Sequence, residues 1–222
     1  MADQHQGFAA YCEAIYELAE DEFDVIQARI ADRLGVSRPA VSEMVRRMAA
    51  EGLVRVHGTT IQLTDQGVAL AERIVRRHRL AERFLTDVLE LSWADAHRQA
   101  NRWEHVIDES VEAAMDRILG RPTTCPHGNP IPGSDYHETA AVPLNDLKVG
   151  AAFTVTRIPE ELEFTDGVLD FLEENTVVPG RNGVLTASSP DGSVTVNIDE
   201  RVVGLGTFAS SRILVLPERT PA

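Results

Sequence analysis

Residues 25–64 carry the pattern that most restricts how this chain can fold. A short amphipathic helix is predicted over 25–34. A three-residue turn follows, and then a second helix that begins at Ser37, a suitable N-cap, and ends at Gly52. Two β-rich runs then flank His57 and the glycine after it, which predicts a hairpin. Helix, turn, helix and hairpin in this order are typical of a winged helix-turn-helix, whose recognition helix here begins at Ser37.

The distribution of charge supports a nucleic-acid contact at this segment. The 222-residue chain has a formal net charge of −14, which argues against a protein that binds polyanions over its whole surface. Residues 1–24 contain seven acidic residues and no lysine or arginine, whereas residues 25–60 contain six arginines and three acidic residues. The predicted winged helix is therefore basic within an acidic chain, and a polyanion would dock there.

Composition narrows the class of protein further. With 43% hydrophobic and 25% charged residues, the chain is typical of a soluble globular protein. No apolar run approaches the ~18 to 20 residues that span a bilayer, and the first residues lack the features of a signal peptide. Cys12 and Cys125 are too few and too far apart for a disulfide framework or a zinc knuckle. We therefore expect a cytoplasmic protein without a membrane partner.

The remaining elements divide the chain into a helical half and a β half. Helices are predicted over 7–20, about 65–90 and about 93–119. Residues 121–141 are rich in proline and glycine, which predicts a linker. Short alternating runs follow to the end of the chain and predict a small β-barrel. The predicted fold is thus mainly α-helical in its N-terminal half, with a winged helix-turn-helix and a helical domain, and all-β in its C-terminal part.

Polar side chains gather beside the apolar stripes of the two long helices. At 100° per residue, four of them share an arc of about 100° on the second helix: His97, Asn101, Glu104 and His105. The first helix places His78 and Glu82 among its apolar residues. A buried imidazole or carboxylate needs a partner, because desolvation alone costs roughly several kcal/mol. This mixture of donors suits a divalent transition metal such as Mn²⁺, Fe²⁺, Co²⁺, Ni²⁺ or Zn²⁺.

Two other interpretations of this cluster stay open at this point. The histidines and glutamates can form a hydrogen-bonded core network, in which case the winged helix would belong to a regulator that senses an organic ligand. A metallohydrolase built on the same residues is a weaker alternative, since the sequence has no HExxH motif and no obvious nucleophile. We therefore expect a protein that is not an enzyme.

Five blocks of the sequence resemble the diphtheria-toxin-repressor family of metal-dependent transcriptional regulators, which has iron- and manganese-dependent members. The blocks are AIYELAED, QARIADRLGVSRPAVSEMVRRMAAEGLV, VRRHRLAERFLTDVL, NRWEHV and HGNPIPG, and the resemblance runs nearly the full length. It implies a winged-helix domain over 1–74, a metal-binding and dimerisation domain over 75–140, and an SH3-like domain over 142–217.

The resemblance also implies a function. The chain would be a homodimeric repressor that controls metal homeostasis by binding palindromic operator DNA, with one or two dimers on each operator. Fe²⁺ or Mn²⁺ would activate it, two ions per subunit, and Co²⁺, Ni²⁺ or Zn²⁺ could substitute.

The resemblance assigns metal ligands to two sites. His78, Glu82 and His97 match an ancillary site, and Glu104 and His105 match a primary, regulatory site. The two remaining primary positions match Ala10 and Asn101, where iron-type members use Met and Cys and manganese-type members use Asp and Glu. Alanine cannot bind a metal, and Asn101 offers only an amide oxygen. The primary site therefore departs from both types.

Further candidates come from α-helical and C-terminal segments outside these positions. Glu13 matches a glutamate that serves in manganese-type members, but Glu13, Glu17 and Glu20 also line one polar helix face that would suit solvent. In the C-terminal domain, Glu163 and Asp166 are candidates for the ancillary site. Cys12 is expected in the core, and Cys125 and His127 are expected to be structural.

The predicted recognition helix supplies the candidate DNA contacts. Five residues would face the major groove: Ser37, Arg38, Pro39, Ser42 and Glu43. Glu43 stands where the family has glutamine, and its carboxylate can accept from cytosine N4 although it repels phosphates. Arg46 and Arg47, with Arg38, are expected to hold phosphates, which position a protein without specifying sequence. Sequence preference would then rest largely on DNA shape.

Overall fold

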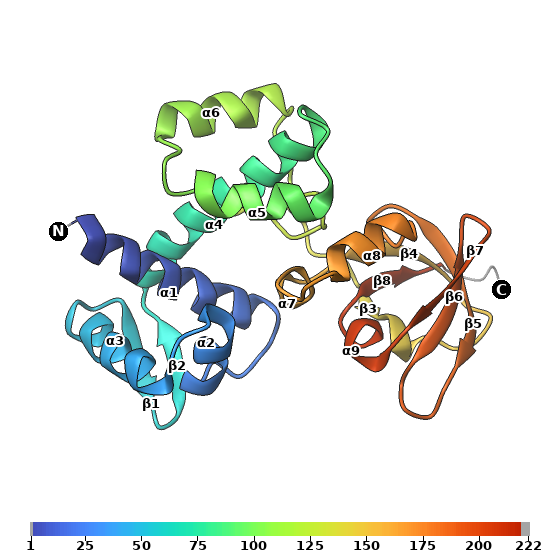
Figure 1. The fold of residues 1–222 in the computed structure, drawn as a ribbon, viewed down its shortest axis with the longest axis horizontal. Coiled ribbons are helices and arrows are strands. Elements are labelled where there is room, and N and C mark those ends of the chain that lie inside the picture. The colour runs from blue at the N-terminus through green and yellow to red at the C-terminus, as the bar shows by residue number, and fades with distance from the viewer. Residues whose placement is uncertain (1, 219–222) are drawn as a thin grey trace.

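The computed structural model describes residues 2–218, with side chains from Gly7 onward, as three packed parts (Figure 1). An N-terminal unit contains helices α1 to α3 and a hairpin, a long helix α4 leads from it to α5 and α6, and a C-terminal sheet follows. The short helix α7 lies between the N-terminal helices and this sheet (Figure 1). No helix in the described part of the chain is long and apolar enough to cross a membrane.

The N-terminal unit is the predicted winged helix-turn-helix. Its elements are α1 (Ala2–Glu20), α2 (Gln27–Leu34), α3 (Arg38–Ala50), β1 (Val54–His57) and β2 (Thr60–Leu63). The Ser37 side chain accepts from the backbone N–H of Ala40 and so caps α3, and Gly35 ends α2 in the left-handed region with φ 63°. β1 and β2 pair antiparallel, with His57 opposite Thr60. The caps and the hairpin confirm the predicted order of elements.

The helical unit differs from the prediction in one respect. It contains α4 (Asp65–Asp87), α5 (Trp93–Trp103) and α6 (Glu109–Ile118). The prediction of a single helix over 93–119 is therefore wrong. The chain leaves α5 at Glu104, and Asp108 starts α6 by accepting from the N–H groups of Ser110 and Val111. An aspartate that binds backbone N–H groups competes with continued helix, which explains the break.

The C-terminal unit is an antiparallel sheet with strand order β3-β8-β4-β5-β6-β7. Its elements are β3 (Val142–Pro143), η1 (Leu144–Asp146), β4 (Ala152–Arg157), α7 (Glu160–Glu163), α8 (Val168–Glu174), β5 (Asn182–Ser188), β6 (Val194–Ile198), β7 (Arg201–Leu205), α9 (Thr207–Ser210) and β8 (Leu214–Pro217). The predicted β domain is confirmed as an antiparallel sheet, but β3, β7 and the short helices were not predicted. Helices of four to seven residues are too short to show a periodic pattern.

The proline- and glycine-rich segment is packed rather than a free linker. Within it, Cys125, His127, Asn129 and Ile131 are buried, and the His127 carbonyl accepts from the N–H of Ile158. A Cβ at Gly128 would lie 2.1 Å from the carbonyl oxygen of the opposing strand β4, and the φ of Gly128 is +88°. Only glycine fits this close approach.

The helical and C-terminal units share a core. Trp93 and Ala94, at the start of α5, are buried in the same apolar cluster as Phe153 and the inner face of the sheet. The backbone N–H of Trp93 donates to the Glu173 side chain at 2.9 Å. The predicted domain boundary at residue 74 falls within α4, and the ranges of the three domains remain predictions.

One close approach in the N-terminal unit yields a stability prediction. A Cβ at Gly67, in the first turn of α4, would lie 2.1 Å from the Leu53 carbonyl oxygen. Alanine is the better helix former by roughly 1 kcal/mol, but overpacking costs about 1–3 kcal/mol. We expect Gly67→Ala to lower the free energy of unfolding by about 1–2 kcal/mol in denaturant titrations. Gly204→Ala, which meets no atom within 4 Å, is the control. A Gly67→Ala protein as stable as its parent would contradict the prediction.

Candidate metal centre

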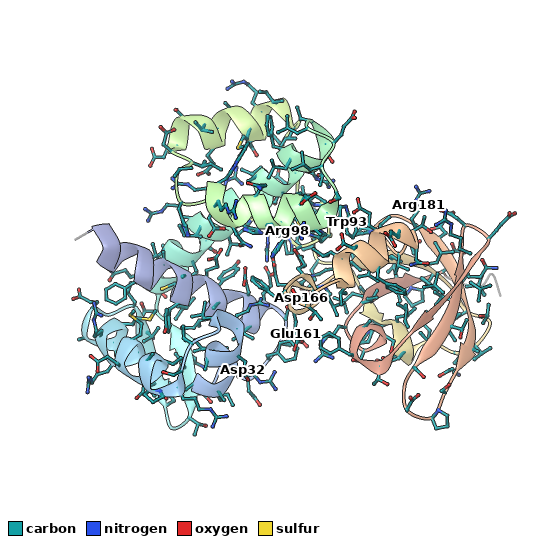
Figure 2. The ribbon with its side chains drawn as sticks, in the orientation of Figure 1. Asp32, Trp93, Arg98, Glu161, Asp166 and Arg181 are labelled. Atoms are coloured by element: carbon teal, nitrogen blue, oxygen red, sulfur yellow. The ribbon has the colours of Figure 1, made fainter. Side chains whose placement is uncertain are left out.

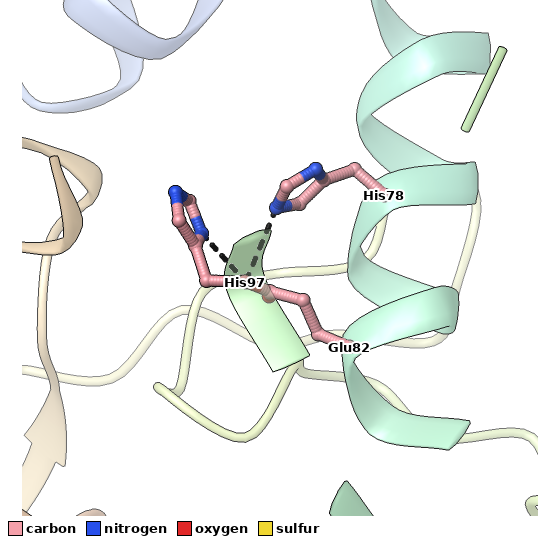
Figure 3. Close-up of side chains that lie close together, drawn as sticks. All are labelled: His78, Glu82 and His97. Carbon is pink, nitrogen blue, oxygen red and sulfur yellow. Dashed lines mark hydrogen bonds and ion pairs between the residues drawn. The ribbon is translucent and has the colours of Figure 1, made fainter. Parts of the chain in front are cut away.

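The predicted metal ligands of α4 and α5 meet in the interior. His78 and Glu82 lie one turn apart on α4, and His97 on α5 turns toward them (Figure 3). Glu82 Oε1 is 3.1 Å from His78 Nε2 and 2.9 Å from His97 Nδ1. All three side chains are buried. The structure therefore brings together the three residues predicted for the ancillary site.

Ligand-capable side chains surround this trio in two sets. We call the first the α1 group: Glu13, His78 and Glu104. We call the second the α7 cluster: Glu82, His97, Cys125, His127, Glu160 and Glu163. Each set contains one or more groups of three whose ligand atoms lie within 4.8 Å of one another. His78 contacts both sets, because its Nδ1 is 2.7 Å from Glu104 Oε2 while its Nε2 faces Glu82.

The C-terminal domain contributes two carboxylates to the α7 cluster. Glu163, a predicted candidate, is buried with its Oε2 3.2 Å from His97 Nδ1. Glu160, which was not predicted, lies one turn earlier on α7 and also faces the cluster. Asp166 is exposed, follows the end of α7 and lies outside these groups (Figure 2). Residues three apart share a helix face, so the short helix presents 160 with 163.

The residues expected at the primary site are only partly assembled. Glu13 and Glu104 join His78, whereas His105 is about a third exposed, with its Nε2 3.4 Å from Glu104 Oε1. Asn101 is partly buried. Because α5 ends at Glu104, the helical spacing assumed for His105 does not continue through it. Roles for His105 and Asn101 as ligands remain predictions.

The acidic face of α1 does not face solvent. Glu17 is 4% exposed, and its Oε2 accepts from the Arg33 guanidinium at 2.9 Å. Glu20 accepts from Arg79. Together with Glu13, these residues direct one face of α1 toward α4 and the metal centre, so the solvated-face interpretation is wrong for Glu17.

Sequence reasoning missed the roles open to Cys125 and His127. His127 Nδ1 is 2.8 Å from Glu163 Oε2 and 3.5 Å from Glu82 Oε2, and Cys125 Sγ is 3.8 Å from His127 Nδ1. Both side chains are fully buried. A proline- and glycine-rich segment has no periodicity to predict where its side chains point. The cysteine–proline–histidine spacing next to a helical His/Glu cluster was the available signal.

Burial and neighbouring charges shift the pKa values of several groups in the metal centre. Burial alone lowers the pKa of His78, but Glu82 and Glu104 outweigh it and raise that pKa well above its usual value. His97 behaves likewise, and Glu163 and Glu82 bring its pKa to about 9. Burial and the neighbouring Glu104 hold the pKa of Glu13 well above its usual value. Near neutral pH, protons thus occupy groups that could bind a cation.

The residues present fit a divalent metal. Within the described part of the chain, six buried atoms of these sets lack a partner with hydrogen-bond geometry: His78 Nε2, Glu82 Oε2, His97 Nε2, His127 Nε2, Glu160 Oε2 and Glu163 Oε2. Leaving a buried polar atom unpaired costs about 1–3 kcal/mol, so such a concentration at one place calls for a ligand. Imidazole and carboxylate donors suit Mn²⁺, Fe²⁺ and Zn²⁺, and the Cys125 thiol adds a softer donor to the α7 cluster.

The recognition helix presents the predicted DNA contacts. Six of the seven predicted side chains are exposed: Ser37, Arg38, Pro39, Ser42, Glu43 and Arg46. The seventh, Arg47, is partly exposed with its guanidinium carbon 5.4 Å from the centre of the Phe8 ring. Arg46 forms an ion pair with Glu43 one turn away. This face is free for a groove of DNA, and the individual contacts remain predictions.

Comparison with known proteins identifies the class to which this fold and centre belong. Residues 8–60 match the N-terminal DNA-binding domain of the iron-dependent repressors, and residues 64–133 match their metal-binding and dimerisation domain. The chain is 40% identical to the iron-dependent repressor IdeR of Mycobacterium tuberculosis over an alignment of 200 residues that covers 85% of this chain and 86% of that protein. It is 44% identical to the diphtheria toxin repressor of Corynebacterium diphtheriae over 138 residues, 60% of this chain and 61% of the relative.

Comparison with solved structures supports the same family. A manganese-dependent transcriptional repressor in complex with manganese superposes with a TM-score of 0.85 at 31% identity, covering 95% of this chain and 100% of the other. The T. acidophilum IdeR structure gives a TM-score of 0.78 at 26% identity, covering 95% and 97%. The chain belongs to the iron-dependent repressor family and is a metal-dependent transcriptional repressor, not an enzyme. The hydrolase and the organic-ligand sensor are thereby set aside.

The raised histidine pKa values predict that metal binding releases protons. A protonated imidazole must lose its proton before its nitrogen can bind a cation, and the pKa of His97 is about 9. At pH 7 we expect release of at least about one proton per bound metal, measured from the dependence of calorimetric enthalpy on the buffer's ionisation enthalpy. The release should decline as the pH rises through about 9. An enthalpy that is independent of the buffer at pH 7 would contradict this.

Proposed function

We propose that this repressor binds Fe²⁺ or Mn²⁺ at two sites per subunit, the α1 group and the α7 cluster, and represses genes of metal homeostasis. In its metal-bound form it would bind palindromic operator DNA as a homodimer, in the cytoplasm. The observation that carries the proposal is the convergence on one centre of six buried ligand atoms that lack a hydrogen-bond partner among the described residues. Relatives named as iron-dependent and manganese-dependent repressors support the same two metals.

The donor sets differ between the two sites. The α1 group offers two carboxylates and one imidazole, which suits Mn²⁺ or Fe²⁺. The α7 cluster adds a thiol and two further imidazoles, so it would accept softer ions, and Co²⁺, Ni²⁺ or Zn²⁺ could substitute there. Asn101 and His105, close in sequence to Glu104, would complete the α1 group, and Asp166 stays a candidate at the α7 cluster.

The α1 group supports a direct route from metal to DNA. Glu13, His78 and Glu104 come from three helices, α1, α4 and α5. Without a cation, burial and the neighbouring Glu104 disfavour ionisation of Glu13 and raise its pKa well above the usual value. A bound cation would let Glu13 ionise and would hold α1 against α4 and α5. The two DNA-reading units of a dimer would then keep the spacing of about one duplex turn, ~34 Å.

Exposed apolar side chains support the dimer. Five lie in the helical unit, near the end of α4 and from α5 to α6: Val88, Leu89, Val106, Val111 and Ile118. Val106, between α5 and α6, is 79% exposed. These side chains belong to the unit that matches the family's dimerisation domain, and we propose that a second copy covers them. One or two such dimers would occupy each operator.

The first test of this function is the metal dependence of DNA binding. A metal that binds only the DNA-competent state must raise operator affinity. We expect Mn²⁺ or Fe²⁺ to increase affinity for operator DNA by at least about tenfold over chelated protein, in gel-shift or fluorescence titrations at fixed salt. Unchanged affinity after thorough chelation would overturn the proposal.

The second test addresses Glu13. Glu13→Gln keeps the side-chain shape but removes the charge, so it should weaken metal binding at the α1 group and leave helical content and dimerisation intact. Metal-activated operator binding should fall at least about tenfold, or ~1.4 kcal/mol. Glu72→Gln, an exposed carboxylate on α4, is the control. If Glu13→Gln binds metal and operator like the parent, Asn101, water or the backbone must complete the site instead.

A further inference from the structure

The far end of α1 is held by a buried arginine that also contacts the metal centre. Arg79, on α4, has an exposure of 0%. Its guanidinium donates to both carboxylate oxygens of Glu20 at 3.0 and 2.7 Å, and to Glu160 Oε1 at 3.0 and 3.2 Å. It also donates to the Pro130 carbonyl. One side chain thus joins the last residue of α1, the buried proline-rich segment and α7.

A second arginine makes a parallel connection from the C-terminal domain. Arg157, at the end of β4, donates to Glu20 Oε2 at 3.0 Å and to Asp21 Oδ1 at 2.6 Å. It also donates to the Asn129 side-chain oxygen, and the Asn129 amide donates to Glu163 Oε1 at 2.6 Å. Two chains of contacts therefore run from α7 to the end of α1, one through Arg79 and one through Asn129 and Arg157.

The two α7 carboxylates divide their oxygens between these chains and the metal centre. In Glu160, Oε1 accepts from Arg79, and the buried Oε2 has no hydrogen-bond partner. In Glu163, Oε1 accepts from Asn129, and Oε2 faces His127 and His97. Each carboxylate thus has one oxygen toward the centre and one toward the DNA-binding unit.

We propose that Arg79 is a positioning residue that couples metal occupancy of the α7 cluster to the end of α1, with Glu20 as the receiving group. This rests on the proposed metal-activated function. A cation in the cluster draws charge from Glu160, which weakens the hold of Glu160 on Arg79. The guanidinium keeps its charge at all accessible pH values, so it binds Glu20 more tightly. Metal loading therefore fixes α1 at its C-terminal end, two turns from Glu13.

The surroundings make this coupling effective. Arg79, Glu160 and Glu20 are largely withdrawn from water, and their attraction is screened less than that of a surface pair. Removing one member leaves a buried charge without a partner, which is strongly unfavourable. A cavity of about 760 Å³ borders Glu20, Asp21 and Arg157, so the end of α1 has room to shift when it is not held.

The test separates metal binding from its consequence. Glu20→Gln removes the receiving charge without touching a metal ligand, and Glu22→Gln, an exposed carboxylate of the same turn, is the matched control. Mn²⁺ affinity is measured by calorimetry, amide hydrogen exchange of residues 14–24 by mass spectrometry with and without Mn²⁺, and operator affinity at fixed salt. In the parent and in Glu22→Gln, we expect Mn²⁺ to slow exchange of this segment by about tenfold.

Glu20→Gln should bind Mn²⁺ with an affinity within about threefold of the parent's. It should nevertheless lose the Mn²⁺-dependent protection from exchange, and the gain in operator affinity that Mn²⁺ gives should be about tenfold smaller than in the parent. Arg79→Lys, which keeps the charge but not the planar fork, should lose the same protection, and the double variant should lose no more than either single one. Parent-like protection in Glu20→Gln, or additive losses in the double variant, would overturn the relay. If Mn²⁺ does not change the operator affinity of the parent protein, the proposed function itself is overturned.

Discussion

Charges buried on α4 must be compensated by groups from four other segments of the chain, and this requirement organises the structure. His78, Arg79 and Glu82 are almost fully withdrawn from water within little more than one helical turn. Their partners come from α1, from α5, from the proline-rich segment and from α7. A buried charge without a partner is costly, so each of these segments has to reach α4 in a defined position. The arrangement of the DNA-binding unit and the C-terminal domain follows from this convergence.

Compensation of buried charge also accounts for the acidic face of α1. Alanine at position 10 offers no metal donor, but α1 faces the centre with a row of carboxylates one or two turns apart, Glu13, Glu17 and Glu20. Each has a separate neighbour: the α1 group for Glu13, Arg33 for Glu17 and the two buried arginines for Glu20. A change of charge in the metal centre can therefore act on α1 through more than one of these carboxylates.

Local chemistry made part of this structure predictable. The Ser37 cap, the glycine that ends α2 and the hairpin at His57 were predicted from local sequence signals, and the structure confirms all three. Helical periodicity placed His78 beside Glu82 and put His97 next to the apolar stripe of the following helix, and the family resemblance grouped the three into one site. Periodicity failed where the helix stops, so His105 was placed by a spacing that ends at Glu104. Periodicity also could not place Cys125, His127 and Glu160, because their positions depend on how a loop and a four-residue helix pack against distant elements.

The strand order of the C-terminal sheet has a consequence for how the protein is made. β8, the last strand in the chain, lies between β3 and β4, the first two strands of its sheet. The core under this sheet includes Trp93, whose ring packs edge-on against His127 at 4.6 Å between centroids. Val215 of β8 belongs to the same core as Trp93. In a chain made from its N-terminus, Trp93 is synthesised long before β8, so the core shared by the helical unit and the sheet is complete only after β8 has been inserted between β3 and β4.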